Sequence, residues 1–149
     1  DLSRTTIYFT HYLFETYRVL GKTEALFERL RLWYELEKNG FVTTFEMPEP
    51  SRSDCHGWGA HPIYHSFATI LGIRPASAGF KTVHIEPQLG PLIRAKGSLV
   101  HPAGVIEVDF RIENGRLRGS VSLPEGVSGA LQHADGKMTL RSGEQAVES

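Results

Sequence analysis

The segment from Ser51 to Pro62, SRSDCHGWGAHP, concentrates the side chains best suited to binding or catalysis. Proline favours the first turn of a helix, where its missing N–H costs nothing, so this segment is predicted to be a tight loop that enters a helix at His61. Glycines flank Trp58 and leave room for a ligand to approach the indole ring. A Trp between two glycines is poorly placed to fill a core, and its face is suited to stacking on a sugar ring.

Two other chemistries fit this segment poorly. Cys55 and His56 are neighbours, and neighbouring side chains diverge, so they do not form a thiolate–imidazole pair. His61 and His65 share a helix face, but the residues between them lack the glutamate of the zincin motif. The sequence therefore favours neither a cysteine nucleophile nor a metal site, and no cofactor is expected.

Helical periodicity dominates the first half of the chain. Apolar side chains surround nearly the whole of a helix predicted over residues 4–20, with Ser3 or Thr5 capping its start. A second helix is predicted to be capped by Thr23 and to close at Asn39-Gly40. Together they form an αα-hairpin with more apolar surface than one partner covers, so we expect self-association or packing against further helices.

A long loop over residues 41–60 separates this hairpin from a third helix, predicted from His61 to Leu71 and ended by Gly72. From Lys81 onward the apolar period changes to two, which is typical of strands. The apolar positions that indicate strands are Val83 and Ile85; Ile93 and Ala95; Val105, Ile106, Val108, Phe110 and Ile112; Leu117, Val121 and Leu123; Ala130 and Leu131.

Asn114-Gly115 predicts a type I′ hairpin turn between two of these strands, and Asp135-Gly136 predicts another turn. No helical pattern interrupts the strands, so the second half of the chain is expected to form an antiparallel β-sandwich. The polar residues 142–149 are expected to fray.

Composition sets broad limits on partners. The chain has 149 residues, a net charge of −1 and intermixed signs, so no basic face for nucleic acid and no polybasic membrane anchor is expected. One cysteine excludes an internal disulfide and leaves the compartment open. The chain opens on Asp1-Leu2-Ser3 without a starting Met, so its N-terminus is interpreted as cut.

The run from Ser51 to Pro62, with Thr43-Thr44-Phe45 before it and Leu71-Gly72-Ile73-Arg74-Pro75 after it, resembles the C-terminal part of bacterial α-L-rhamnosidases. The segment GFKTVHIEPQLG at 79–90 continues a resemblance that covers roughly residues 5 to 125. Enzymes of this family are much larger, with a six-hairpin α/α barrel that carries the active site and a β-sandwich after it.

The resemblance implies an α+β fragment of such an enzyme. Residues 1–76 would be the closing section of the α/α barrel, with about three helices, and residues 77–149 the C-terminal β-sandwich. The remainder of the barrel would be its partner.

The resemblance also implies roles for individual residues. Glu46, shortly after the Thr-Thr pair, matches the general base that activates water for inversion at the anomeric carbon. Glu49 is the alternative, because the spacing between Phe45 and the glutamate differs from the family's pattern. His61 matches a ligand of sugar hydroxyls, Trp58 would stack on the sugar, and the general acid would come from upstream of this chain.

The implied function is release of terminal α-L-rhamnose from a glycoside or polysaccharide. The alternative is a non-catalytic module, in which the β half packs against or binds carbohydrate and the helices are a docking surface. Read without the resemblance, Glu46 is a solvated loop carboxylate and His61 is a helix-start histidine bonded to backbone. Arg52 and Asp54, two positions apart in the loop, are expected to pair and brace the site.

Overall fold

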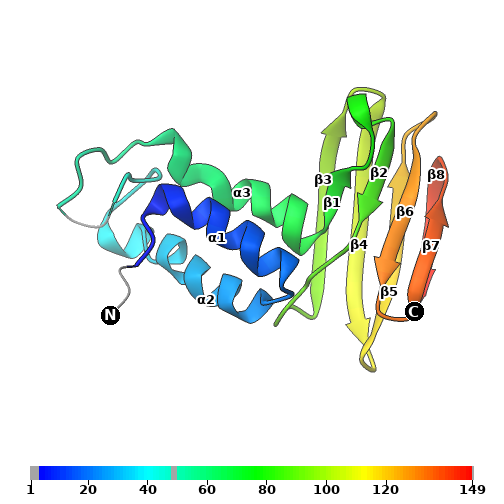
Figure 1. Cartoon of the computed structure of the whole chain (residues 1–149), viewed down its shortest axis with the longest axis horizontal. Helices are drawn as coiled ribbons and strands as arrows, with labels where there is room; N and C mark the ends of the chain where they lie inside the picture. Colours follow the sequence, from blue (N-terminus) through cyan, green and yellow to red (C-terminus); the bar gives the residue numbers. More distant parts are fainter. Residues whose placement is uncertain (1–3, 48–49, 149) are drawn as a thin grey trace. The chain divides into compact units, whose positions relative to one another are not determined.

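The computed structural model of the protein describes residues 4–47 and 50–148. The chain forms two compact units, unit 1 over Asp1–His65 and unit 2 over Ser66–Ser149. Unit 1 holds helices and unit 2 holds the strands. Figure 1 colours the chain in this order, from blue helices to orange and red strands. The helices-then-strands order confirms the predicted α+β class. The division at 76/77 into a barrel section and a sandwich domain stays a prediction.

The first helix, α1, spans Ile7–Val19 and is shorter than predicted. Its cap is Thr6, whose hydroxyl accepts a hydrogen bond from the Phe9 amide at 3.2 Å. Of the two predicted caps, Ser3 lies outside the described residues. The prediction of Thr5 as the cap was wrong. A capping residue has an extended backbone and directly precedes the helix, and Thr6 is the residue in that position.

The second helix, α2, spans Thr23–Tyr34, with Thr23 as its first helical residue rather than its cap. A 3₁₀ turn, η1 (Glu37–Asn39), follows, and Gly40 at φ 83° ends the helical path as the sequence predicted. Helices α1 and α2 contact each other and form the predicted αα-hairpin. No helix over residues 4–47 and 50–148 has the length and apolar content that a membrane span requires.

A small core holds the loop to the helices of unit 1. Ile7 of α1, Leu36 and Phe45 are all buried and pack together, and Phe41 stacks on Phe45 with ring centroids 5.0 Å apart. Other large apolar side chains of α1 and of Leu20, which follows it, remain exposed, as the sequence predicted: Tyr8, Phe9, Tyr12, Val19 and Leu20.

The predicted third helix consists of two pieces. The α-helical turn α3 (His61–His65) continues into the π-helical turn η3 (Ser66–Ile70), and Gly72 at φ 73° stops it. Leu71 closes the wide turn by donating its amide to the Ser66 carbonyl at 3.0 Å. The division between the two compact units falls inside this helix, between His65 and Ser66.

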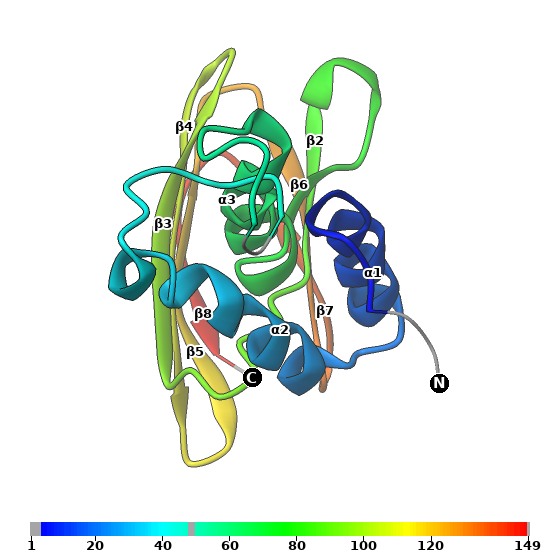
Figure 2. The ribbon, with the colours of Figure 1, turned by 90° about the vertical axis from the view of Figure 1, so that its left-hand side faces the viewer.

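Unit 2 is a sandwich of two four-stranded sheets, which Figure 2 shows as two layers. One sheet has the order β1-β2-β6-β7 and the other β3-β4-β5-β8. The strands are β1 (Ile73–Pro75), β2 (Thr82–Ile85), β3 (Arg94–His101), β4 (Gly104–Glu113), β5 (Arg116–Leu123), β6 (Ser128–His133), β7 (Gly136–Leu140) and β8 (Gly143–Glu148). A 3₁₀ turn, η4 (Ala78–Phe80), precedes β2.

The core of the sandwich is built from the inward residues of both sheets. The largest fully buried members are Val83, Ile85, Ile106, Val108, Phe110, Val121, Leu131 and Leu140. With Leu117 and Leu123, which are also buried in this core, nine of the apolar positions that indicated strands are core residues. Period-two apolar residues all face the same side of a strand, which explains the agreement.

Three details of the sandwich differ from the prediction. Strands β2 and β6 pair in parallel, with Val83 opposite Gly129, so the sandwich is antiparallel except for this pair. The tail does not fray: β8 pairs with β5 and buries Val147. The last turn is shifted by one residue, because His133 pairs with Gly136 and leaves Ala134 and Asp135 at its centre.

The other predicted turn is confirmed. Asn114 and Gly115 lie at φ 53° and 76°, the two positive angles that a type I′ turn requires. They join Glu113 of β4 to Arg116 of β5, which are paired.

Candidate active site

Two stretches of the long loop are fastened to each other by backbone hydrogen bonds. The His56 amide donates to the Thr44 carbonyl at 2.7 Å, and the Glu46 amide donates to the Ser53 carbonyl at 2.9 Å. The Thr44 hydroxyl adds a bond to the His56 carbonyl at 2.8 Å. The Thr43 hydroxyl likewise donates to the Asp54 carbonyl. The threonine pair thus holds the loop in a defined shape, and this shape positions Glu46, the residue that follows Phe45.

Phe45 and Glu46 face opposite sides of this extended segment. Phe45 is buried in the small core of unit 1, and successive side chains of an extended chain point in opposite directions. Glu46 consequently turns away from the core and lines a surface hollow of about 340 Å³. The residues that line the hollow are Thr6, Tyr8, Phe9, Glu46, Met47, Arg52 and Trp58.

The hollow brings together two of the predicted site residues, Glu46 and Trp58. Tyr8 and Phe9 of α1 form its apolar wall, and the sequence analysis missed them as site residues. Apolar residues at helical spacing are typical of a packing surface. The only signal in the sequence was the excess of apolar residues around the first helix.

Glu46 forms a bidentate ion pair with Arg52. The Arg52 Nε donates to one carboxylate oxygen at 3.2 Å, and its Nη2 donates to the other. The Glu46 side chain is only 10% exposed, whereas Arg52 is 76% exposed. The predicted partner of Arg52, Asp54, was wrong: Asp54 is exposed and can stay in water, whereas a carboxylate shielded from solvent needs a charged partner.

The pair fixes the orientation of the carboxylate. Both of its oxygens accept from the Arg52 guanidinium, and this bidentate contact restricts the rotamers of Glu46. Among the described residues that line the hollow, Glu46 is the single carboxylic acid. The hollow therefore offers one oriented carboxylate beside aromatic rings.

Trp58 is 45% exposed and forms part of an aromatic cluster. The Tyr8 ring lies edge-on to it at 5.5 Å between centroids, and the His56 ring lies at 4.0 Å. Because nearly half of Trp58 remains exposed beside these rings, part of its indole surface is open to a ligand.

The two glycines beside Trp58 have different roles. Gly57 has open space around it, in agreement with the predicted room for a ligand. Gly59 is buried instead, and a Cβ there would lie 2.9 Å from the Phe45 carbonyl oxygen. Its own carbonyl accepts a hydrogen bond from Trp33 Nε1 at 2.7 Å. Gly59 therefore lets the turn that carries Trp58 lie directly on the loop.

His61 occupies the predicted helix start but is not among the residues that line the hollow. Its Nε2 donates to the Ile7 carbonyl at 3.1 Å, and its ring packs edge-on to Phe14 and Trp33. Burial lowers the pKa of His61 to about 4, although the bond to Ile7 acts in the opposite direction, so the ring is neutral at pH 7. Its role as a sugar ligand stays a prediction. Glu49, the alternative base, lies outside the described residues.

Among the described residues, one group could hold a metal ion: His11, His61 and His65. These three side chains come from α1 and α3. The sequence analysis expected no metal, and it did not place His11 beside the other two.

Residues 72–148 match the family described as the bacterial α-L-rhamnosidase C-terminal domain. The chain belongs to this family. The match confirms the resemblance seen in the sequence and extends it to the end of β8, past the predicted limit near residue 125, because the tail is a paired strand of the sandwich.

Known rhamnosidases are similar to this chain over most of its length. An α-L-rhamnosidase of Alteromonas sp. (strain LOR) is 29% identical over 143 residues, covering 84% of this chain and 15% of that protein. A GH78 family rhamnosidase of Bacillus sp. GL1 has a TM-score of 0.79 at 25% identity, covering 88% of this chain and 15% of its own. The α-L-rhamnosidase of Streptomyces avermitilis, solved in complex with L-rhamnose, shares the fold at 20% identity and a TM-score of 0.62, covering 76% of this chain and 14% of its own.

The chain thus spans about 15% of the length of the rhamnosidases that it matches. The likeness to the Bacillus enzyme covers more of the chain than unit 2 alone contains, so it includes helical residues as well as the sandwich. The predicted fold class is confirmed by this likeness.

Proposed function

We propose that this chain is the C-terminal part of a longer enzyme that hydrolyses terminal α-L-rhamnosyl linkages with inversion. The observation that carries the proposal is the meeting of Glu46 and Trp58 in one hollow of unit 1, with the carboxylate held by Arg52. Membership of the rhamnosidase family and the names of the similar enzymes supply the substrate class.

In the proposed reaction Glu46 is the general base. Its carboxylate takes a proton from a water molecule as that water attacks the anomeric carbon, and the glycosidic bond breaks on the opposite face. An inverting glycosidase needs a second carboxylic acid roughly 6.5–9.5 Å away to protonate the leaving oxygen. The described lining of the hollow holds no such acid, so this group comes from the rest of the proposed enzyme.

The aromatic residues of the hollow fit a 6-deoxy sugar. Trp58 and Tyr8 present apolar faces at 45% and 42% exposure, and the methyl group that distinguishes rhamnose from its hydroxymethyl analogues is apolar. Arg52 has free donor positions on a largely exposed guanidinium, so it holds the base and can also donate to a sugar hydroxyl.

The function is tested by assaying the longer polypeptide on aryl α-L-rhamnoside and, as a matched substrate, on aryl α-D-mannoside. We expect turnover of the rhamnoside and release of β-configured rhamnose, seen by proton NMR early in the reaction. The 149-residue chain alone is the negative control, because its hollow offers one carboxylate of the required two. Rhamnose binding without turnover by the longer polypeptide would instead support the non-catalytic carbohydrate module.

Replacing Trp58 tests the sugar platform. Trp58→Ala in the longer enzyme should raise KM for the aryl rhamnoside by about 2- to 10-fold, because an aromatic contact contributes about 0.5–1.5 kcal/mol. Tyr34→Ala is the matched control, since Tyr34 is 67% exposed on α2 and does not line the hollow. Equal KM values for the two variants would show that Trp58 does not contact the substrate.

A further inference from the structure

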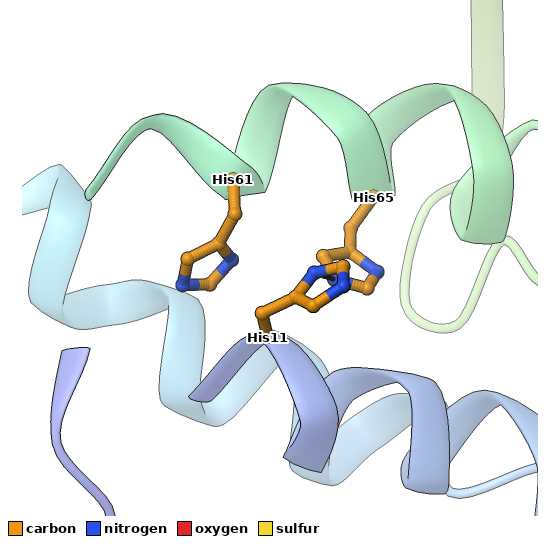
Figure 3. A group of neighbouring side chains, drawn as sticks. All are labelled: His11, His61 and His65. Carbon is orange, nitrogen blue, oxygen red and sulfur yellow. Dashed lines mark hydrogen bonds between the residues drawn. The ribbon is translucent and has the colours of Figure 1, made fainter. Parts of the chain in front are cut away.

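Three imidazole rings gather between α1 and α3 in unit 1 (Figure 3). One ring nitrogen from each of His11, His61 and His65 lies within 4.8 Å of the others. The closest pair is His11 Nδ1 and His65 Nε2, which are 3.1 Å apart. The cluster is shielded from solvent: His65 is fully buried, and the other two are partly buried.

The proton positions in this cluster follow from the hydrogen bonds. A carbonyl oxygen only accepts, so the bond from His61 to Ile7 requires the proton to sit on His61 Nε2. His61 Nδ1 then carries a lone pair, and this atom is buried without a hydrogen-bond partner among the described residues. Figure 3 shows a ring nitrogen of His61 on the side that faces His11 and His65.

The contact between His11 and His65 adds a second lone pair. Two ring nitrogens 3.1 Å apart can share only one proton, so one of them is an acceptor in every neutral arrangement. A divalent metal ion would take the place of this proton between the two rings, with the ring that donated it carrying its proton on its other nitrogen instead, so that all three imidazoles stay neutral. The ion would also use the buried lone pair of His61. The Ile7 carbonyl would then accept the far N–H of a ligand histidine, as backbone carbonyls commonly do around a metal-bound imidazole.

We propose that His11, His61 and His65 form a binding site for a zinc-class divalent transition metal ion. His61 and His65 are four residues apart on one helical turn, a spacing that places both rings on the same face. Tetrahedral zinc with Zn–N bonds of 2.0–2.1 Å places its ligand nitrogens about 3.3 Å apart. The 3.1 Å pair already fits this separation, and the other separations, which are at most 4.8 Å, would have to shorten when the ion binds.

The ligand set selects the class of metal. Three neutral imidazoles suit zinc, copper or nickel, whereas calcium and magnesium require oxygen ligands. A bound ion would link the first turns of α1 to α3. Ile7, whose carbonyl holds His61, is directly followed by Tyr8 and Phe9, which line the hollow. The metal site does not depend on the proposed glycosidase reaction, because it rests on side chains that lie outside the hollow.

The test is metal titration of the untagged, chelator-treated 149-residue chain. With Co²⁺ as a spectroscopic probe, we expect the visible ligand-field bands of a four-coordinate site, and Zn²⁺ should displace the Co²⁺ and raise the Tm. His11→Gln should weaken Zn²⁺ binding at least about 100-fold, because it removes one of three ligands and loss of a group that only hydrogen-bonds to a ligand already costs about 10- to 100-fold. The matched control is His84→Gln, which removes a partly exposed histidine of unit 2 that bonds to Glu86 and should leave binding unchanged.

NMR of the wild-type chain provides a measurement that does not depend on the folding of a variant. On addition of Zn²⁺, the ring nitrogen resonances of His11, His61 and His65 should shift, while those of the other four of the seven histidines stay in place. The proposal is overturned if Co²⁺ gives only the pale spectrum of the hydrated ion, if His11→Gln binds Zn²⁺ as tightly as wild type, or if Zn²⁺ shifts a different set of histidines.

Discussion

Replacing Glu46 with Gln in the longer enzyme should lower kcat on an aryl α-L-rhamnoside by about 10²–10⁴-fold and change KM little. The loss is confined to kcat because a general base acts only as the water attacks. Azide should restore turnover, since an anionic nucleophile needs no base, and the product should be the β-configured glycosyl azide. Steady-state kinetics and product NMR measure both effects.

Folding should not be affected by this change. Gln has the shape of Glu, and Arg52, which would lose its ionic partner, is 76% exposed and returns to water. Glu49→Gln is the control and should behave like wild type. If Glu49→Gln shows the kcat loss and the azide rescue while Glu46→Gln keeps its activity, the base is Glu49 and the spacing across Phe45 was misread.

Gly72→Ala should destabilise unit 2 by about 3 kcal/mol or more. Gly72 lies at φ +73° where η3 gives way to β1, and a Cβ there would stand 2.1 Å from the Glu86 carbonyl carbon and oxygen. The Glu86 amide also donates to the Gly72 carbonyl at 3.1 Å, so the two backbones cannot separate without losing this bond. Urea unfolding followed by circular dichroism of the 149-residue chain measures the cost.

Gly126→Ala is the control that separates the cost of the steric clash from the cost of the positive backbone angle. Gly126 has nearly the same φ, +76°, but nothing lies within 4 Å of the Cβ it would gain. Its replacement should cost only about 1–2 kcal/mol, the penalty of a left-handed conformation. Equal costs at the two positions would show that the backbone around Gly72 relaxes freely.

The elements that could be predicted from the sequence are those with a local signal. The strands from β3 to β5 carry repeated apolar residues at period two, and Asn114-Gly115 fixes the turn between β4 and β5. The glycines at 40 and 72 end helical segments because only a glycine accepts their positive φ cheaply. Each of these features depends on a few neighbouring residues, so it can be recognised in the sequence alone.

What escaped prediction depends on distant partners. Residues 143–148 are polar and look disordered, yet β5 supplies their hydrogen bonds and one valine anchors them in the core. The parallel pairing of β2 with β6 has no local signal at all, since neither strand encodes its neighbour's direction.

The candidate site divides in the same way. Glu46 and Trp58 stand in recognisable local patterns, and the structure brings them to one hollow. Asp54 was the predicted partner of Arg52 because the two are close in sequence. The observed partner is Glu46, because its buried carboxylate needs a charged neighbour. His11 joined no pattern because 54 residues separate it from His65, and only the packing of α1 on α3 brings the two rings together.

The parallel pairing of β2 with β6 also constrains the order in which unit 2 folds. Strands β3, β4 and β5 are joined by tight turns and can zip together as they leave the ribosome, at little loop-closure cost. Strand β2 can pair with β1 early, but its ladder with β6 must wait until the chain has been synthesised through Leu131, the partner of Ile85. During that interval the layer that covers the apolar side of the hairpin sheet is incomplete, so this nascent domain is exposed to aggregation until β6 and the strands after it have been added.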